Sequence, residues 1–203
     1  MTPGPPESNE FSGADGLPVI AFASRAAWEE WLGRKHARAG GAWLKIAKKG
    51  SGIESVSYGA ALDGALCWGW IDGQRAPLDE LWFLTRFTPR KPRGRWSANN
   101  RVKAEELIAR GEMKPAGLEQ VNAAKADGRW DAAYPGQRDA VVPADLRQAL
   151  DGNPAAAEFF VALDSSNRYA FLYRLHHVTR ADARAERIAR YVAMLARGET
   201  LHD

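Results

Sequence analysis

Hydrophobic residues near the start of the chain change from helical spacing to strand-like alternation. Trp28 and Leu32 lie at helical spacing after Ser24, a favourable N-cap, and predict a helix over residues 24–38. In residues 42–49, AWLKIAKK, apolar and other residues alternate as in a half-buried strand. The chain therefore begins with a mixture of helix and strand.

A second apolar stripe predicts a helix that leads into a hairpin. Ser57 is a suitable N-cap, and apolar residues recur after it at helical spacing as far as Leu66. Gly69 allows a sharp turn. The segments WIDGQR (residues 70–75) and LWFLTRFT (residues 81–88) then predict two antiparallel strands.

The rest of the chain predicts helices. Two of them follow the hairpin, and three or four more form the C-terminal part. We therefore expect an α+β fold, with a small antiparallel sheet packed with helices and then a helical C-terminal subdomain. The predicted parts are a flexible N-terminal tail (1–18), an α+β domain (19–128), a connecting segment (129–142) and the helical subdomain (143–203).

Composition narrows the function classes. Cys67 is the only cysteine, so no internal disulfide forms, and the absence of a long apolar run predicts no membrane span. The first residues lack a signal-peptide pattern, and we expect a cytoplasmic protein. No cofactor or metal is expected, since His176 and His177 are adjacent rather than at ligand spacing, and no nucleotide-binding or hydrolase motif occurs.

A basic segment is the first candidate site. The net charge is only +3, but residues 86–103 contain seven Lys and Arg residues and no Asp or Glu. Arginine matches phosphate and carboxylate geometry, and a helix N-terminus favours anions. The candidate anion-binding residues are Arg86, Arg90, Lys91, Arg93, Arg95, Trp96, Ser97 and Asn100. The alternative interpretation is a solvated charged loop.

A second candidate site lies in the segment CWGWIDGQR, residues 67–75. It comprises Trp70, Asp72 and Arg75, although regular alternation places Asp72 and Arg75 on opposite faces of the strand. The alternative interpretation is a buried structural joint in which Asp72 pairs with Arg86 or Arg90 across the sheet.

Several strings together resemble the YdeI/OmpD-associated family of bacteriocin-protection proteins. They include WLKIAKKGSGI, YGAALDGALCWGWIDGQR, FLTRFTPRKPRGRWS and FFVALDSSNRYAFLYRLHHVTRADARAERIARYVAMLARGE, and the resemblance extends over about residues 22–200. The resemblance implies a cytosolic bacterial protein linked to antimicrobial-peptide resistance, with a mixed α/β first part and a helical second part. It implies no established reaction and no catalytic residues.

Three hypotheses follow for function. The first is a non-enzymatic binding protein with a role in bacteriocin protection, whose partner is an acidic protein or another anionic ligand, because like charges disfavour direct capture of cationic peptides. The second is a protein that binds nucleic acid or a phosphate ligand through residues 86–103, with Trp96 as a stacking surface. The third is an enzyme with a site around Asp72.

Overall fold

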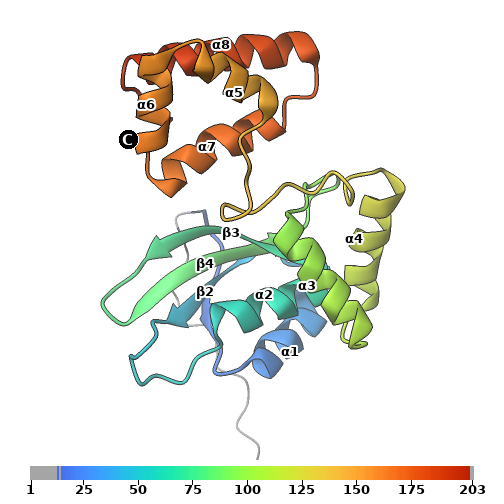
Figure 1. Cartoon of the computed structure of the whole chain (residues 1–203). Coiled ribbons are helices and arrows are strands. Elements are labelled where there is room, and N and C mark those ends of the chain that lie inside the picture. Colours follow the sequence, from blue (N-terminus) through green and yellow to red (C-terminus); the bar gives the residue numbers. More distant parts are fainter. Residues whose placement is uncertain (1–12, 14, 202–203) are drawn as a thin grey trace, which may run out of the picture. The chain divides into compact units, whose positions relative to one another are not determined.

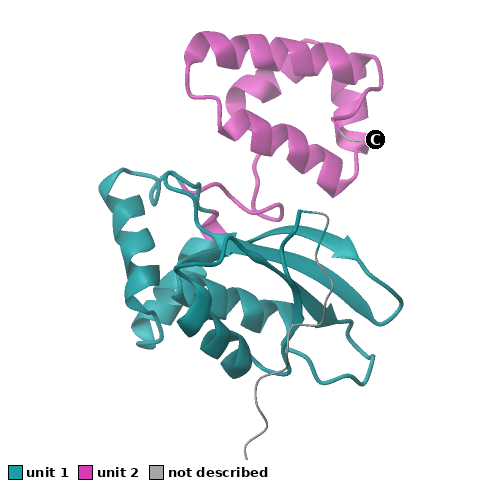
Figure 2. Ribbon diagram, turned by 180° about the vertical axis from the view of Figure 1, so that it is seen from behind, with its two compact units in different colours: residues 1–96, 100–132 teal, residues 97–99, 133–203 magenta. Residues whose placement is uncertain are grey.

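The computed structural model of the chain describes residues 13 and 15–201. The chain divides into two compact units, coloured separately in Figure 2: residues 1–96 with 100–132, and residues 97–99 with 133–203. The division at residues 132 and 133 lies inside the segment predicted as the connection. Each unit is described separately below.

The first unit contains a sheet and four helices (Figure 1). In chain order its elements are β1 (Val19–Ala21), α1 (Arg25–Lys35), β2 (Ala42–Ala47), α2 (Tyr58–Cys67), β3 (Trp70–Pro77), β4 (Trp82–Pro89), α3 (Ala98–Ala109) and α4 (Pro115–Ala126). Ser24 and Ser57 cap α1 and α2, as predicted, by accepting hydrogen bonds from backbone N–H groups three residues later.

The sheet has four strands in the order β1-β2-β4-β3. The α+β class is confirmed, but the sheet is mixed rather than wholly antiparallel, because β1 runs parallel to β2. Strand β1 spans only three residues, VIA, which are too few to show an alternating pattern. Helix α1 supplies the crossover connection that two parallel strands require.

The core of the first unit lies between the sheet and the helices α1 and α2. Trp28 of α1 is fully buried, and its indole Nε1 donates to the carbonyl oxygen of Ala61 in α2 at 3.0 Å. Its ring packs against Phe87 of β4 and the edge of Trp70 of β3, with centroids 5.8 and 6.1 Å apart. One side chain therefore joins α1, α2 and two strands. Cys67 is also buried, as predicted.

The N-terminal tail predicted for residues 1–18 lies mostly outside the described residues. Its last part is packed rather than flexible. Asp15 accepts a hydrogen bond from the indole Nε1 of Trp43 at 2.9 Å and forms an ion pair with Arg86 at 2.7 Å. The backbone N–H of Trp43 donates to the carbonyl oxygen of Pro18 at 2.9 Å. Residues 15–18 thus belong to the folded unit.

The second unit is helical. Its main elements are α5 (Ala144–Asp151), α6 (Pro154–Ala162), α7 (Ser165–His176) and α8 (Ala181–Ala196). Phe171 of α7 and Tyr191 of α8 are fully buried and meet edge to face, with centroids 5.0 Å apart. Four helices at these positions agree with the apolar spacing of the sequence. No helix in the described part of the chain is long and apolar enough to cross a membrane.

The close approach of α4 to the end of α2 generates a stability prediction. A Cβ atom at Gly117 would lie 2.4 Å from the backbone oxygen of Cys67, which cannot move as a side chain would. We expect Gly117→Ala to lower the free energy of unfolding by about 1–3 kcal/mol through overpacking. Urea denaturation measures this change.

Gly59 provides the matched control, because it also lies in a helix and an added Cβ meets nothing within 4 Å. Gly59→Ala is expected to leave stability unchanged or raise it by up to about 1 kcal/mol, since alanine has the higher helix propensity. Equal effects of the two substitutions would contradict the close approach.

Candidate functional site

The predicted basic segment separates into exposed and buried residues. Lys91, Arg93 and Arg95 are exposed. Arg90 and Trp96, in contrast, are only 7% and 2% exposed. The surface that an anion can reach is therefore narrower than the sequence predicts, and the three exposed residues are called the basic turn below.

The basic turn has a tight backbone conformation. The N–H of Gly94 donates to the carbonyl oxygen of Lys91 at 2.8 Å, which closes a turn with Pro92 second and Arg93 third. Arg93 has φ of 63°, and it is the one non-glycine residue with positive φ in the described part of the chain. A type II turn requires positive φ at its third position and favours glycine or asparagine there. The fold thus holds an arginine where its backbone is strained.

Two sets of contacts, one buried and one partly buried, support the basic turn. The guanidinium of Arg90 lies 3.5 Å from the ring centroid of Trp96, and the Trp96 ring meets Trp130 at 4.8 Å. Arg129 donates through Nη1 to the carbonyl oxygen of Gly94 at 2.8 Å. Trp96 was predicted as a stacking surface for a ligand. Its ring is instead covered by Arg90 and Trp130, so it is a support and not a contact surface.

The remaining residues predicted for the anion site have other roles or positions. Arg86 is half-buried and forms the ion pair with Asp15. Asn100 is half-buried in α3. Ser97 belongs to the second unit, where its backbone bridges Tyr134. These three residues therefore do not add exposed charge to the basic turn.

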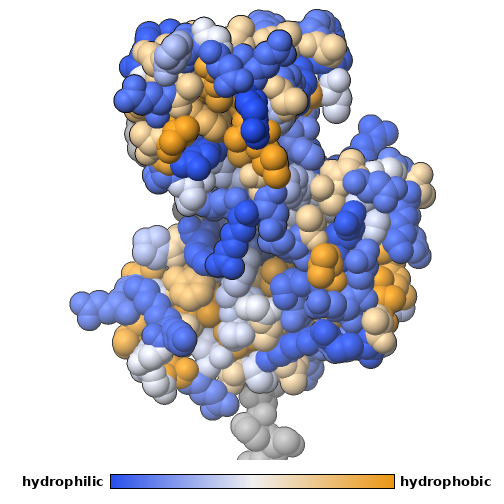
Figure 3. Space-filling model, in the orientation of Figure 1, coloured by the Kyte–Doolittle hydropathy of each residue, from blue (hydrophilic) through white to orange (hydrophobic). Residues whose placement is uncertain are grey.

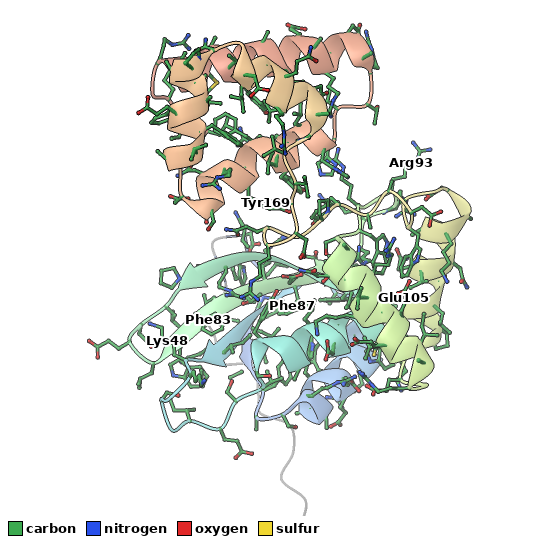
Figure 4. All side chains as sticks on the ribbon, in the orientation of Figure 1. Lys48, Phe83, Phe87, Arg93, Glu105 and Tyr169 are labelled. Atoms are coloured by element: carbon green, nitrogen blue, oxygen red, sulfur yellow. The ribbon has the colours of Figure 1, made fainter. Side chains whose placement is uncertain are left out.

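One carboxylate lies close enough to the basic turn for its pKa to be affected by the positive charge. The pKa of Asp127 is lowered, first by hydrogen bonding to Arg129 and to a smaller extent by the charge of Arg93. Lys91, Arg93 and Arg95 nevertheless form no ion pair with a carboxylate among the described residues. Their charges are available to a partner. In Figure 4 Arg93 extends away from the ribbon.

The second candidate site is built on an irregularity in the sheet. Asp72 pairs with Phe87 and Arg75 with Thr85, so three steps along β3 match two along β4. This bulge moves Arg75 to the face that Asp72 occupies, whereas regular alternation predicts opposite faces. Gly73 inside the strand is the sequence signal for such a bulge.

Tyr58 of α2, which helical spacing in the sequence places on an apolar stripe, is the residue that joins Asp72 and Arg75. Its hydroxyl donates to Asp72 Oδ2 at 2.6 Å, and the guanidinium of Arg75 lies 4.3 Å from its ring centroid. The expected pairing of Asp72 with Arg86 or Arg90 does not occur.

Asp72 is only partly buried, so the enzyme hypothesis, which requires an accessible carboxylate, stays a prediction.

Trp70 does not belong to this cluster. It is 1% exposed, and its indole Nε1 donates to the carbonyl oxygen of His36 at 3.2 Å. Its edge packs against Trp31, with centroids 5.8 Å apart. Trp70 is therefore a core residue, whereas Asp72 is partly buried and Arg75 is exposed.

A cavity of about 450 Å³ adjoins Tyr58. Its lining comes from the end of β2, the following loop, the start of α2 and Phe83 of β4. Lys48 and Lys49 line it from the loop, and both are exposed. Lys48 and Phe83 are labelled at this end of the sheet in Figure 4. Basic and aromatic side chains therefore line the same cavity.

The helical unit has a smaller cavity of about 270 Å³ with aromatic walls. Tyr169 and Tyr173 of α7 line it together with Tyr134, and the hydroxyl of Tyr169 donates to the carbonyl oxygen of Pro135 at 2.9 Å. Burial raises the pKa of Tyr169 to about 12. Hydrophobic residues gather near the middle of the helical unit on the face in Figure 3.

The strained conformation of Arg93 generates a prediction. Arg93→Asn should change the free energy of unfolding by less than about 0.5 kcal/mol, because asparagine tolerates positive φ. Arg93→Val should lower it by about 1 kcal/mol or more, because β-branched residues disfavour that region. Urea denaturation measures both, and Arg95→Val is the control at a neighbouring exposed position. An equal loss for Arg93→Val and Arg95→Val would contradict the strained turn.

The hydrogen bond between Tyr58 and Asp72 predicts a pH dependence. Burial, and then the bond to Asp72, raise the pKa of Tyr58 above its ordinary value. The unfolded chain loses this proton near pH 10, its ordinary value, whereas the folded protein keeps it. The stabilisation is therefore complete below about pH 10 and is lost as the pH rises toward the folded pKa.

The stability difference between the parent protein and Tyr58→Phe measures this contribution. We expect the difference in free energy of unfolding to shrink between pH 8 and about pH 11, as the unfolded phenol ionises. A difference that stays constant over this interval would show that the phenol titrates equally in both states.

Comparison with known proteins shows that two parts of the chain match different family models. Residues 20–120 match a model described as a domain of unknown function (DUF8412). Residues 139–198 match the model described as "Bacteriocin-protection, YdeI or OmpD-Associated". Searches of curated proteins and of solved structures found no match.

The second match is narrower than the resemblance seen in the sequence, which extends over about residues 22–200. The difference arises because the sheet-containing unit matches a separate family model. Residues 139–198, most of the helical unit, match the YdeI/OmpD-associated model, so the resemblance is confirmed for that part of the chain.

Proposed function

We propose that this protein is a non-enzymatic binding protein that acts in bacteriocin protection by engaging an acidic protein partner through the basic turn. The match of residues 139–198 to the bacteriocin-protection family model supports the protective role. The observation that carries the binding role is the arrangement of Lys91, Arg93 and Arg95, three exposed cations on a supported turn.

The contacts that hold the basic turn in place favour a role in binding over a role in keeping the protein soluble. Charged residues on a flexible loop lose side-chain and backbone freedom when they bind a partner, which reduces the affinity. Here the backbone is closed by the bond from Gly94 to Lys91, and Arg129 holds the same turn from α4's C-terminal side. Folding therefore already orders the backbone of the basic turn, which reduces the entropy that is lost when a partner binds.

The choice of partner rests on Trp96. Proteins that bind single-stranded nucleic acid combine cations with exposed aromatic rings on which bases stack. Trp96 is 2% exposed and covered by Arg90, so the aromatic part of such a site is missing from the basic turn. Arginine also pairs with carboxylates through two parallel hydrogen bonds. An acidic protein surface suits the exposed groups better than a nucleic acid.

Fluorescence anisotropy with a labelled glutamate-rich peptide tests the proposal. Binding should weaken as salt rises, because exposed charges are screened. Lys91→Ala/Arg93→Asn/Arg95→Ala should lower the affinity at least about tenfold, which corresponds to about 1.4 kcal/mol. The matched control, Lys35→Ala/Arg38→Ala/Arg147→Ala, removes the same charge from three other exposed positions and should retain most of the affinity.

Three results would overturn the proposal: no binding at low salt, equal losses in the triple variant and the control, or tighter binding of a single-stranded oligonucleotide of matched charge. The last result would favour the nucleic-acid hypothesis. Protection itself is measured as survival of a bacteriocin-sensitive host that expresses the protein. The triple variant should lose the survival that the control variant preserves.

A further inference from the structure

The cavity beside Tyr58 has the size and lining of a small-molecule site. Its volume of about 450 Å³ falls within the range of about 300–1,000 Å³ that such sites occupy. Ile46, Ile53, Val56 and Phe83 supply an apolar wall. A concave apolar wall with a few charged groups at the rim is the usual form of a ligand pocket.

The rim of the cavity carries positive charge that the protein does not neutralise. Lys48 and Lys49 are adjacent, exposed, and in no ion pair with a carboxylate of the described residues. Glu54 belongs to the same loop but does not line the cavity. Two neighbouring ammonium groups suit a phosphate, which carries about two negative charges, better than a single carboxylate.

The aromatic side chains at the cavity are held in place before any ligand arrives. Tyr58 is anchored by its bond to Asp72, and Arg75 lies 4.3 Å from the Tyr58 ring and 5.1 Å from the Phe83 ring. The guanidinium therefore adds charge beside two rings that both line the cavity. Aromatic surfaces fixed in this way favour a planar partner, because little side-chain freedom is lost on binding.

We propose that this cavity binds a small molecule that contains both a phosphate group and an aromatic ring system, the class that includes nucleoside monophosphates. Lys48 and Lys49 would hold the phosphate, and Tyr58 and Phe83 would contact the ring. This site is separate from the basic turn, and it does not depend on the function proposed for that turn.

Isothermal titration calorimetry with adenosine 5′-monophosphate tests the proposal. Adenosine supplies the ring without the phosphate, and inorganic phosphate supplies the charge alone. We expect the monophosphate to bind at least about tenfold more tightly than either fragment. O-phospho-L-tyrosine, which carries phosphate on a smaller ring, is the second probe, and tighter binding of that probe would support the same class with a phenyl ring.

Variants locate the site. Lys48→Ala/Lys49→Ala should weaken monophosphate binding at least about tenfold, whereas Lys35→Ala/Arg38→Ala removes equal charge elsewhere and should change it less than about twofold. Lys91→Ala/Arg93→Asn/Arg95→Ala should also bind normally, which separates this site from the basic turn. Thermal denaturation confirms that each variant is folded.

Four results would overturn the inference. They are no binding of either phosphorylated probe up to about 1 mM, adenosine binding as tight as that of the monophosphate, inorganic phosphate binding as tight as that of the monophosphate, and unchanged binding in Lys48→Ala/Lys49→Ala. The first result would exclude this class of phosphorylated compound as the ligand. The second and third would show that the site does not recognise the ring and the phosphate together. The fourth would show that the ligand binds elsewhere.

Discussion

The burial of tryptophan is the constraint on which the first unit depends. A buried indole contributes a large apolar surface, and its N–H usually has an acceptor as well. Trp28 meets both demands by bonding to Ala61, and Trp70 by bonding to His36. These two bonds connect α1 with α2 and β3 with the end of α1. The helices are thereby fixed over the sheet, and the strand ends are placed where the candidate sites form.

The basic turn and the cavity beside Tyr58 lie at opposite ends of one strand. Phe83, near the start of β4, lines the cavity, and the basic turn follows the end of β4 at Pro89. A strand of this length spans roughly 25 Å at about 3.3 Å per residue. That separation exceeds the distance over which exposed charges interact at physiological salt. A small anion and a protein partner would therefore bind without competing for the same groups.

Much of the fold follows from sequence pattern, because apolar spacing indicates most helices and three strands, and serine caps mark the starts of α1 and α2. The sites follow less directly. Trp96 is covered by Trp130, which lies far along the chain, and no local pattern reveals that contact. The cluster of Asp72 and Arg75 depends on a bulge that reverses the simple alternation rule. Charge and motif patterns therefore indicate candidate segments, but long-range packing decides which of their side chains remain exposed.

The bulge in β3 also affects how the folded protein behaves in a crowded solution. Strand β3 lies at the edge of the sheet, where unpaired backbone groups offer a template for another chain. The irregular step between Asp72 and Arg75 breaks this row of groups, and Pro77 at the end of the strand has no N–H to donate. A long straight edge would invite strand-to-strand aggregation. The bulge that brings Asp72 and Arg75 to one face therefore also hinders another chain from adding a strand to this edge.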